Sequence, residues 1–201
     1  MRNVILFFLV STFLLAFGTP KQIEINHHTF DLVQEYYNEY GERGVSLKFY
    51  AHGANKEKLP MLALSLMNST GACSGKSIQD GTYEINGTKI IYYSHWERKG
   101  NAGDAPEGDL IQTYKVYQNG TITRVSGELY IEDHVRGNNS SDGMQYLFDA
   151  PKTTEEEKAL KDYIKSIERR FGGEFVRGKE AEALKKRVRD ALARKHKKLW
   201  Q

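Results

Sequence analysis

The chain has 201 residues, with 29 Lys and Arg, 26 Asp and Glu and a formal net charge of +3. This length suits one domain of ordinary size, or one domain with an appendage, and it is sufficient to bury a full hydrophobic core. A single cysteine, Cys73, excludes a disulfide within the chain. Small exported domains of animal cells usually contain several disulfides, so the composition favours a bacterial protein.

Residues 1–18 have the pattern of a cleaved signal peptide. An apolar run from Val4 to Phe17 follows Arg2, and Ala16 and Gly18 place small residues at the two positions that a signal peptidase reads. An uncleaved anchor is the alternative, but about 14 apolar residues are short for a span that needs roughly 20. We therefore expect an exported protein, either periplasmic or secreted.

A helix and two strands are predicted next along the chain. Thr29 can cap a helix over 30–40, in which aromatic and apolar residues recur at helical spacing. Apolar and polar residues then alternate over 45–51 and again over 62–67, which is the period of a half-buried strand. A loop rich in Gly, Ser and Asn is expected over 68–81.

Two Asn-Gly dipeptides, Asn86-Gly87 and Asn119-Gly120, predict the hairpins at the centre of the sheet. Asn-Gly between runs of β-branched and aromatic residues is typical of a two-residue hairpin turn. A turn of this kind at Asn86-Gly87 would place Glu84 opposite Lys89. The loop between the hairpins, over 98–109, is expected to be a solvated acidic segment.

The second hairpin brings two like charges together. A two-residue turn at Asn119-Gly120 would pair Leu110 with Leu129 on an apolar face and Lys115 with Arg124 on the other face. Like charges directly opposite each other destabilise a sheet. The pair is therefore either two splayed, solvated side chains or an anion-binding site.

Two helices are predicted after Pro151. Thr154 and Glu157 have the spacing of a capping box, and apolar residues follow at helical spacing as far as Phe171, before Gly172-Gly173. A second amphipathic helix is expected over 179–199. The predicted fold class is α+β: an N-terminal helix, an antiparallel meander sheet of about six strands, and two C-terminal helices. We expect a signal peptide at 1–18, a sheet domain at 19–151 and a helical region at 152–201, whose first helix packs on the sheet.

Charge is distributed unevenly along the chain. Residues 152–201 contain 16 Lys and Arg against 9 Asp and Glu, whereas the preceding residues contain 13 against 17. The chain thus consists of a mildly acidic body and a basic tail, which suggests that the tail meets something acidic. That partner is an anionic membrane surface, an acidic envelope protein or the acidic body of this protein itself. Nucleic acid is disfavoured for an exported chain.

The candidate binding residues are the two hairpin cations and the residues of the second helix: Lys115, Arg124, Lys185, Lys186, Arg187, Arg189, Arg194, Lys195, Lys197, Lys198 and Trp200.

Catalytic and metal chemistry find weak support in the sequence. Cys73 lies in a Gly-x-Cys-x-Gly segment that resembles a nucleophile elbow only in its spacing, because the helix that such an elbow requires does not follow. His52, His95 and His134 fall near predicted strand ends but without the close spacing of metal ligands, so we expect surface histidines and no cofactor.

The first hypothesis is therefore a non-catalytic binding or interaction protein. The alternatives are a small exported hydrolase that uses Cys73 and a carrier of an apolar ligand held between sheet and helix.

Overall fold

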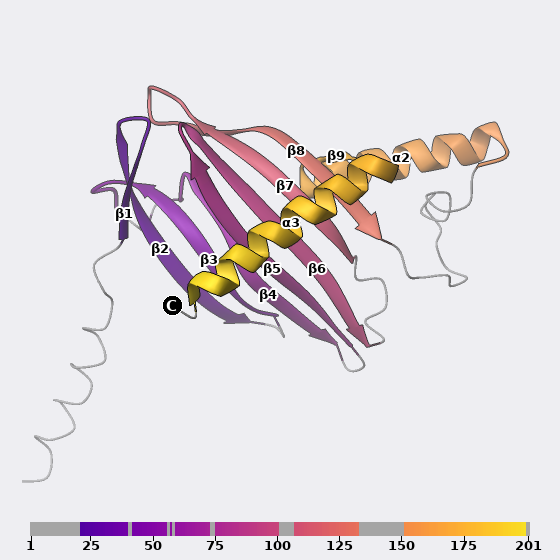
Figure 1. The fold of residues 1–201 in the computed structure, drawn as a ribbon, viewed down its shortest axis with the longest axis horizontal. Coiled ribbons are helices and arrows are strands. Elements are labelled where there is room, and N and C mark those ends of the chain that lie inside the picture. Colours follow the sequence, from indigo (N-terminus) through magenta and orange to yellow (C-terminus); the bar gives the residue numbers. More distant parts are fainter. Residues whose placement is uncertain are drawn as a thin grey trace, which may run out of the picture.

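The computed structural model describes residues 21–39, 42–55, 57, 59–72, 75–100, 107–132 and 151–199. Nine strands form one sheet, in which each strand lies beside the next one in the chain (Figure 1). Neighbouring strands are antiparallel, except that β9 runs parallel to β8. The strands are β1 (Lys21–Ile25), β2 (His28–Glu39), β3 (Glu42–Ala51), β4 (Leu62–Ala72), β5 (Gly75–Asn86), β6 (Lys89–Gly100), β7 (Glu107–Val116), β8 (Ile122–Glu132) and β9 (Glu174–Phe175).

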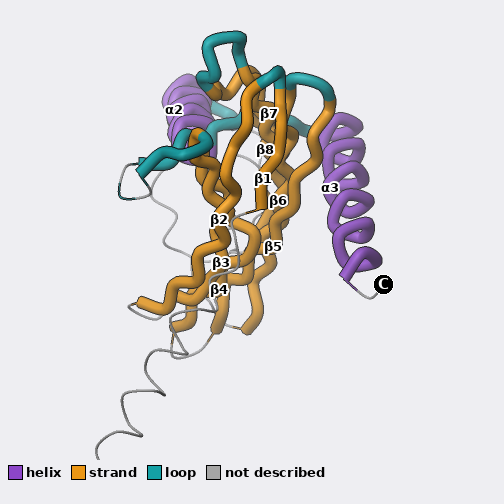
Figure 2. The backbone as a smooth tube through the Cα atoms, turned by 90° about the vertical axis from the view of Figure 1, so that its left-hand side faces the viewer, coloured by secondary structure: helices purple, strands orange, loops and turns teal. Residues whose placement is uncertain are grey.

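Two helices follow most of the sheet in the chain, α2 (Thr154–Phe171) and α3 (Gly178–Leu199). They lie on opposite sides of the sheet, which we name the α2 face and the α3 face (Figure 2). Among the described residues, no helix is both long and apolar enough to cross a membrane. The predicted signal peptide lies outside the described residues.

The predicted fold class is wrong in two respects, because the sheet has nine strands rather than about six and, among the described residues, no helix precedes it. The segment predicted as a helix over 30–40 is strand β2. Phe30 and Leu32 are both buried, since positions two apart face the same side of a strand. Asn26 and His27 both take positive φ, which makes the tight turn that pairs β1 with β2.

The loop predicted over 68–81 is also mostly strand. β4 continues to Ala72 and β5 begins at Gly75, so both strands are longer than the alternation of apolar residues indicated. In the following hairpin, Asn86 pairs with Lys89, and Gly87 takes positive φ in the turn. Glu84 therefore lies opposite Ile91, not opposite Lys89.

The β7–β8 hairpin has a longer turn than predicted. Val116 pairs with Ile122, and the amide of Gly120 donates to the carbonyl of Tyr117 at 2.9 Å. A β-bulge between Thr113 and Tyr114 compensates for this one-residue shift, so the predicted pair of Leu110 with Leu129 is present. A bulge thus restores the register that buries the apolar side chains.

The α2 face holds the larger of two hydrophobic clusters, which extends from β1 to β8. Curvature of the sheet closes much of it: Asn26, in the β1–β2 turn, donates from Nδ2 to the carbonyl of Val116 on β7 at 3.0 Å. These residues are far apart in strand order, so the sheet must bend strongly. α2 completes the cluster with Ile167 and Phe171, and the ring of Phe171 lies 5.1 Å from that of Trp96.

The capping box of helix α2 begins one residue earlier in the chain than predicted. Thr153, not Thr154, is the N-cap, and its hydroxyl accepts from the amide of Glu156 while the Glu156 carboxylate accepts from the Thr153 amide. The helix ends, as expected, at Gly172, which takes the left-handed conformation.

The α3 face holds the smaller cluster, in which α3 buries Leu184, Val188, Ala191 and Leu192 against the sheet. Tyr93 of β6 and Ile111 of β7 are their main buried partners. The apolar stripe of the basic helix is therefore part of the protein core.

We predict that Leu184→Ala destabilises the protein by about 2–5 kcal/mol, because Leu184 is fully buried and its truncation leaves a cavity under α3. Chemical denaturation followed by circular dichroism measures the change. Lys186→Ala, at an exposed position of the same helix, is the control and should change stability by less than about 0.5 kcal/mol. Equal effects of the two substitutions would contradict the packing described for α3.

Candidate functional site

The basic side chains of α3 mostly contact the sheet of this same protein. Arg187 forms a bidentate ion pair with Glu128 of β8. Near the other end of the helix, Nε of Arg194 donates to Glu84 of β5 at 3.0 Å. These pairs place acidic residues of the sheet opposite cations of α3. The acidic body of the protein itself was one of the three partners considered for the basic tail.

Lys195 and Lys185 are also engaged with their own chain. Nζ of Lys195 donates to Asp80 at 2.6 Å and to the carbonyl of Gly81 at 2.9 Å. Nζ of Lys185 lies 4.0 Å from the ring centroid of Tyr130 and 3.1 Å from Glu182. Four of the predicted tail cations are thus held within the protein.

The remaining predicted tail residues divide into two groups. Lys186 and Arg189 are exposed, and within the described part of the chain neither forms an ion pair. The side chains of Lys197 and Lys198, and the whole of Trp200, lie outside what the structure describes.

Lys115 and Arg124 do not form the predicted pair. Because of the longer turn, Lys115 lies opposite Thr123 and Arg124 lies opposite Tyr114. Nζ of Lys115 lies 5.1 Å from the ring of Tyr117, whereas the guanidinium of Arg124 packs against Gly172 at the end of α2. The structure does not bring these two cations together.

Cys73, the candidate nucleophile, lies outside the described residues, as does His134. Within the described part of the chain, no group of three or more potential metal ligands is close enough to hold a metal ion.

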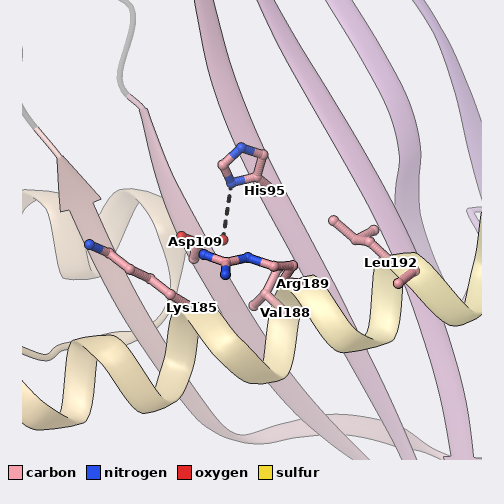
Figure 3. A pocket seen from close by; sticks show the side chains of 7 residues that line it. His95, Asp109, Lys185, Val188, Arg189 and Leu192 are labelled. Carbon is pink, nitrogen blue, oxygen red and sulfur yellow. Dashed lines mark hydrogen bonds and ion pairs between the residues drawn. The ribbon is translucent and has the colours of Figure 1, made fainter.

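A pocket of about 440 Å³ lies between α3 and the sheet (Figure 3). One wall is apolar and comes from Val188, Leu192 and Ala193 of α3. Among the described residues, the polar lining comes from His95, Asp109, Lys185 and Arg189. Pockets of this size, with an apolar wall and a few polar groups, are typical sites for small ligands.

His95 and Asp109 form the polar centre of the pocket. They are cross-strand partners on β6 and β7, and Nδ1 of His95 lies 3.0 Å from the Asp109 carboxylate. The Asp109 side chain is 11% exposed and that of His95 is 39% exposed. The hydrogen bond to Asp109 raises the pKa of His95 above its ordinary value, with a further contribution from the charges of Glu107 and Glu97, although burial opposes the shift.

The described lining of the pocket contains a His–Asp pair without a nucleophile beside it. His95 has a carboxylate partner, as a catalytic histidine does, but the described residues that line the pocket include no Ser, Thr or Cys that it could activate. An imidazole held by Asp109 at Nδ1 presents its other ring nitrogen for a hydrogen bond to a ligand.

A second His-Asp pair has a structural role. Asp31 on β2 accepts from His52 at 2.9 Å and from the amide of Gly53 at 3.4 Å, which ties the end of β3 to β2. The hydrogen bond from His52 is the main reason that the pKa of Asp31 lies below its usual value.

The sequence reasoning missed the pocket. It placed Asp109 in a solvated loop and His95 on the surface, whereas Asp109 is a buried residue of β7. No alternation marks the start of β7, because residues 107–109 are Glu, Gly and Asp and the first apolar residue is Leu110.

Comparisons with protein-family models, with curated protein sequences and with solved structures gave no match to this chain.

We predict that His95 stabilises the protein more at low pH than at high pH. Because its folded-state pKa is raised, this contribution is fully present below the ordinary pKa of about 6.5 and is lost as the pH rises through the folded-state value. The melting temperatures of wild type and His95→Gln should therefore converge as the pH rises above about 6.5. A difference that stays constant over this range would contradict the ion pair with Asp109.

Proposed function

We propose that this protein is a non-catalytic binding protein that holds a small, mainly apolar molecule in the pocket between α3 and the sheet. The observation that carries the proposal is the wall of Val188, Leu192 and Ala193 facing the His95–Asp109 pair across the pocket. An apolar wall provides affinity through burial, whereas a few fixed polar groups orient the ligand.

The way α3 is fixed to the sheet supports this proposal. Ala181 and Leu184 anchor the helix upstream of the pocket, and Lys195 anchors it downstream through Asp80. A pocket between two such anchor points has a defined shape before any ligand arrives, and preorganisation of this kind reduces the entropic cost of binding.

We predict that Ala193→Trp, which adds a large side chain to the pocket wall, abolishes binding of the neutral apolar dye Nile red at this site. The matched control is Ala183→Trp, because Ala183 is exposed on the same helix and is not part of the pocket lining. Fluorescence titration of the full-length chain measures binding. Dye bound elsewhere, for instance to the apolar N-terminal segment, affects both variants equally.

If the two tryptophan variants bind the dye alike, the pocket is not the binding site and the proposal fails. Native mass spectrometry of the full-length protein provides an independent test: a co-purified small molecule is expected in wild type and in Ala183→Trp, but not in Ala193→Trp.

A second candidate function is contact with an anionic membrane surface through the outer side of α3. The specific observation is that Lys186 is exposed and forms no ion pair within the described part of the chain. A cation at this position can approach an anionic surface without breaking a contact of the fold, unlike Arg187 or Arg194.

We predict that Lys186→Glu weakens co-sedimentation with vesicles containing phosphatidylglycerol by about fivefold or more, since each cation near such a surface contributes about 1 kcal/mol. Lys158→Glu, at an exposed position of α2, is the matched control because it changes the net charge equally. Equal binding of the two variants would show that net charge, rather than the α3 surface, controls the association.

A further inference from the structure

We propose that the ligand of the α3 pocket is a carboxylate-bearing amphiphile, with its carboxylate at Arg189 and its apolar chain along Val188, Leu192 and Ala193. This inference rests on the proposed function and specifies its ligand class. Figure 3 shows the Arg189 side chain projecting from α3 beside Asp109 and the apolar wall.

Arg189 is the group best placed to bind an acidic head group. It lines the pocket, it is exposed, and within the described residues it forms no ion pair, so its guanidinium donors are available. The planar guanidinium fork matches a carboxylate in a bidentate geometry. Lys185, the other cation of the lining, is already engaged with Glu182 and the ring of Tyr130.

The His95–Asp109 pair lies beside this head-group site in the pocket lining. Nδ1 of His95 is held by Asp109, so the proton gained on protonation is carried by the outward ring nitrogen. Figure 3 shows this nitrogen on the side of the ring that faces away from Arg189, so the carboxylate is bound by Arg189 alone. His95 and Arg189 come from β6 and α3, so the pocket is complete only when α3 is docked on the sheet.

The acidic groups around the pocket favour a single negative charge. Asp109 balances the charge of a protonated His95, and Glu107 and Glu97 also act on the His95 ring. A dianionic head group such as a phosphate monoester would be repelled by these three carboxylates. Among the described lining residues, Arg189 alone has a positive charge that is not already balanced, so it could neutralise only one of the two negative charges. A cationic amine would face Arg189 and Lys185, and an alcohol would leave Arg189 without a partner.

The apolar part of the ligand follows from the opposite wall. Val188 is fully buried and Leu192 nearly so, whereas Ala193 is exposed at the edge of the pocket. Because Val188 and Leu192 are already shielded, a short alkyl chain gains affinity mainly by covering exposed Ala193 and the edge of Leu192, which a lone exposed ion pair does not do.

The test is displacement of Nile red from the full-length protein by octanoate, octanol, octylamine and octyl phosphate at neutral pH. We expect octanoate to displace the dye at a concentration about tenfold lower than octanol does, since a charge-assisted bidentate hydrogen bond is gained. Octylamine should be the weakest competitor. Arg189→Gln should bring octanoate to the level of octanol and leave octanol unchanged, whereas Lys186→Gln should alter neither.

Three results would overturn the inference while leaving the proposed function intact, provided that Ala193→Trp still blocks the dye. These are equal displacement by octanoate and octanol, displacement by octyl phosphate at or below the octanoate concentration, and an equal loss of octanoate and octanol binding in Arg189→Gln. Failure of Nile red to distinguish Ala193→Trp from Ala183→Trp would instead remove the proposed function, and this inference with it.

Discussion

The docking of α3 on the sheet is the interaction on which both the pocket and the proposed membrane-contact surface depend. Burial of side chains such as Leu184 and Val188 contributes about 1.5–3 kcal/mol each, whereas exposed ion pairs such as Arg194–Glu84 are screened by solvent and contribute much less. Apolar burial therefore holds the helix, and the ion pairs set its direction and position along the strands. This division explains why a strongly basic helix serves as a structural element.

The same residues on α3 fitted several interpretations at the level of sequence. An apolar stripe flanked by cations is expected of a membrane-surface helix and of a helix docked on an acidic domain. The residues that decide between these interpretations are Asp80, Glu84 and Glu128. They lie 115, 110 and 59 positions along the chain from their respective partners Lys195, Arg194 and Arg187. Helical periodicity located the helix correctly, but only the strand order and register bring these carboxylates beneath it.

The errors in the fold have equally local causes. The β2 segment carries apolar residues at both helical and strand spacing, and the turn at Asn26-His27, which decides between them, lacks the glycine that marks the two Asn-Gly hairpins. At Asn119-Gly120 the turn was located correctly, but a loop longer by one residue shifts every pair up to the bulge. Lys115 and Arg124 fall within the shifted part, whereas Leu110 and Leu129 lie beyond the bulge and keep their partners. The pairing of His95 with Asp109 likewise depends on the β6–β7 register, which no short-range signal provides.

The two faces of the sheet differ in the size of the hydrophobic cluster that each one carries. The α2 face carries the larger cluster, closed by the bend of the sheet and by α2, so an opening there would expose core side chains such as Phe49 and Leu129. The α3 face has the smaller cluster, and its pocket lies where Leu192 gives way to exposed Ala193. A cavity at that border leaves most of the core untouched. The buried carboxylate of Asp109 is tolerated at this border because it has a hydrogen-bonding partner in His95. In return, Asp109 holds the His95 ring in place at the pocket.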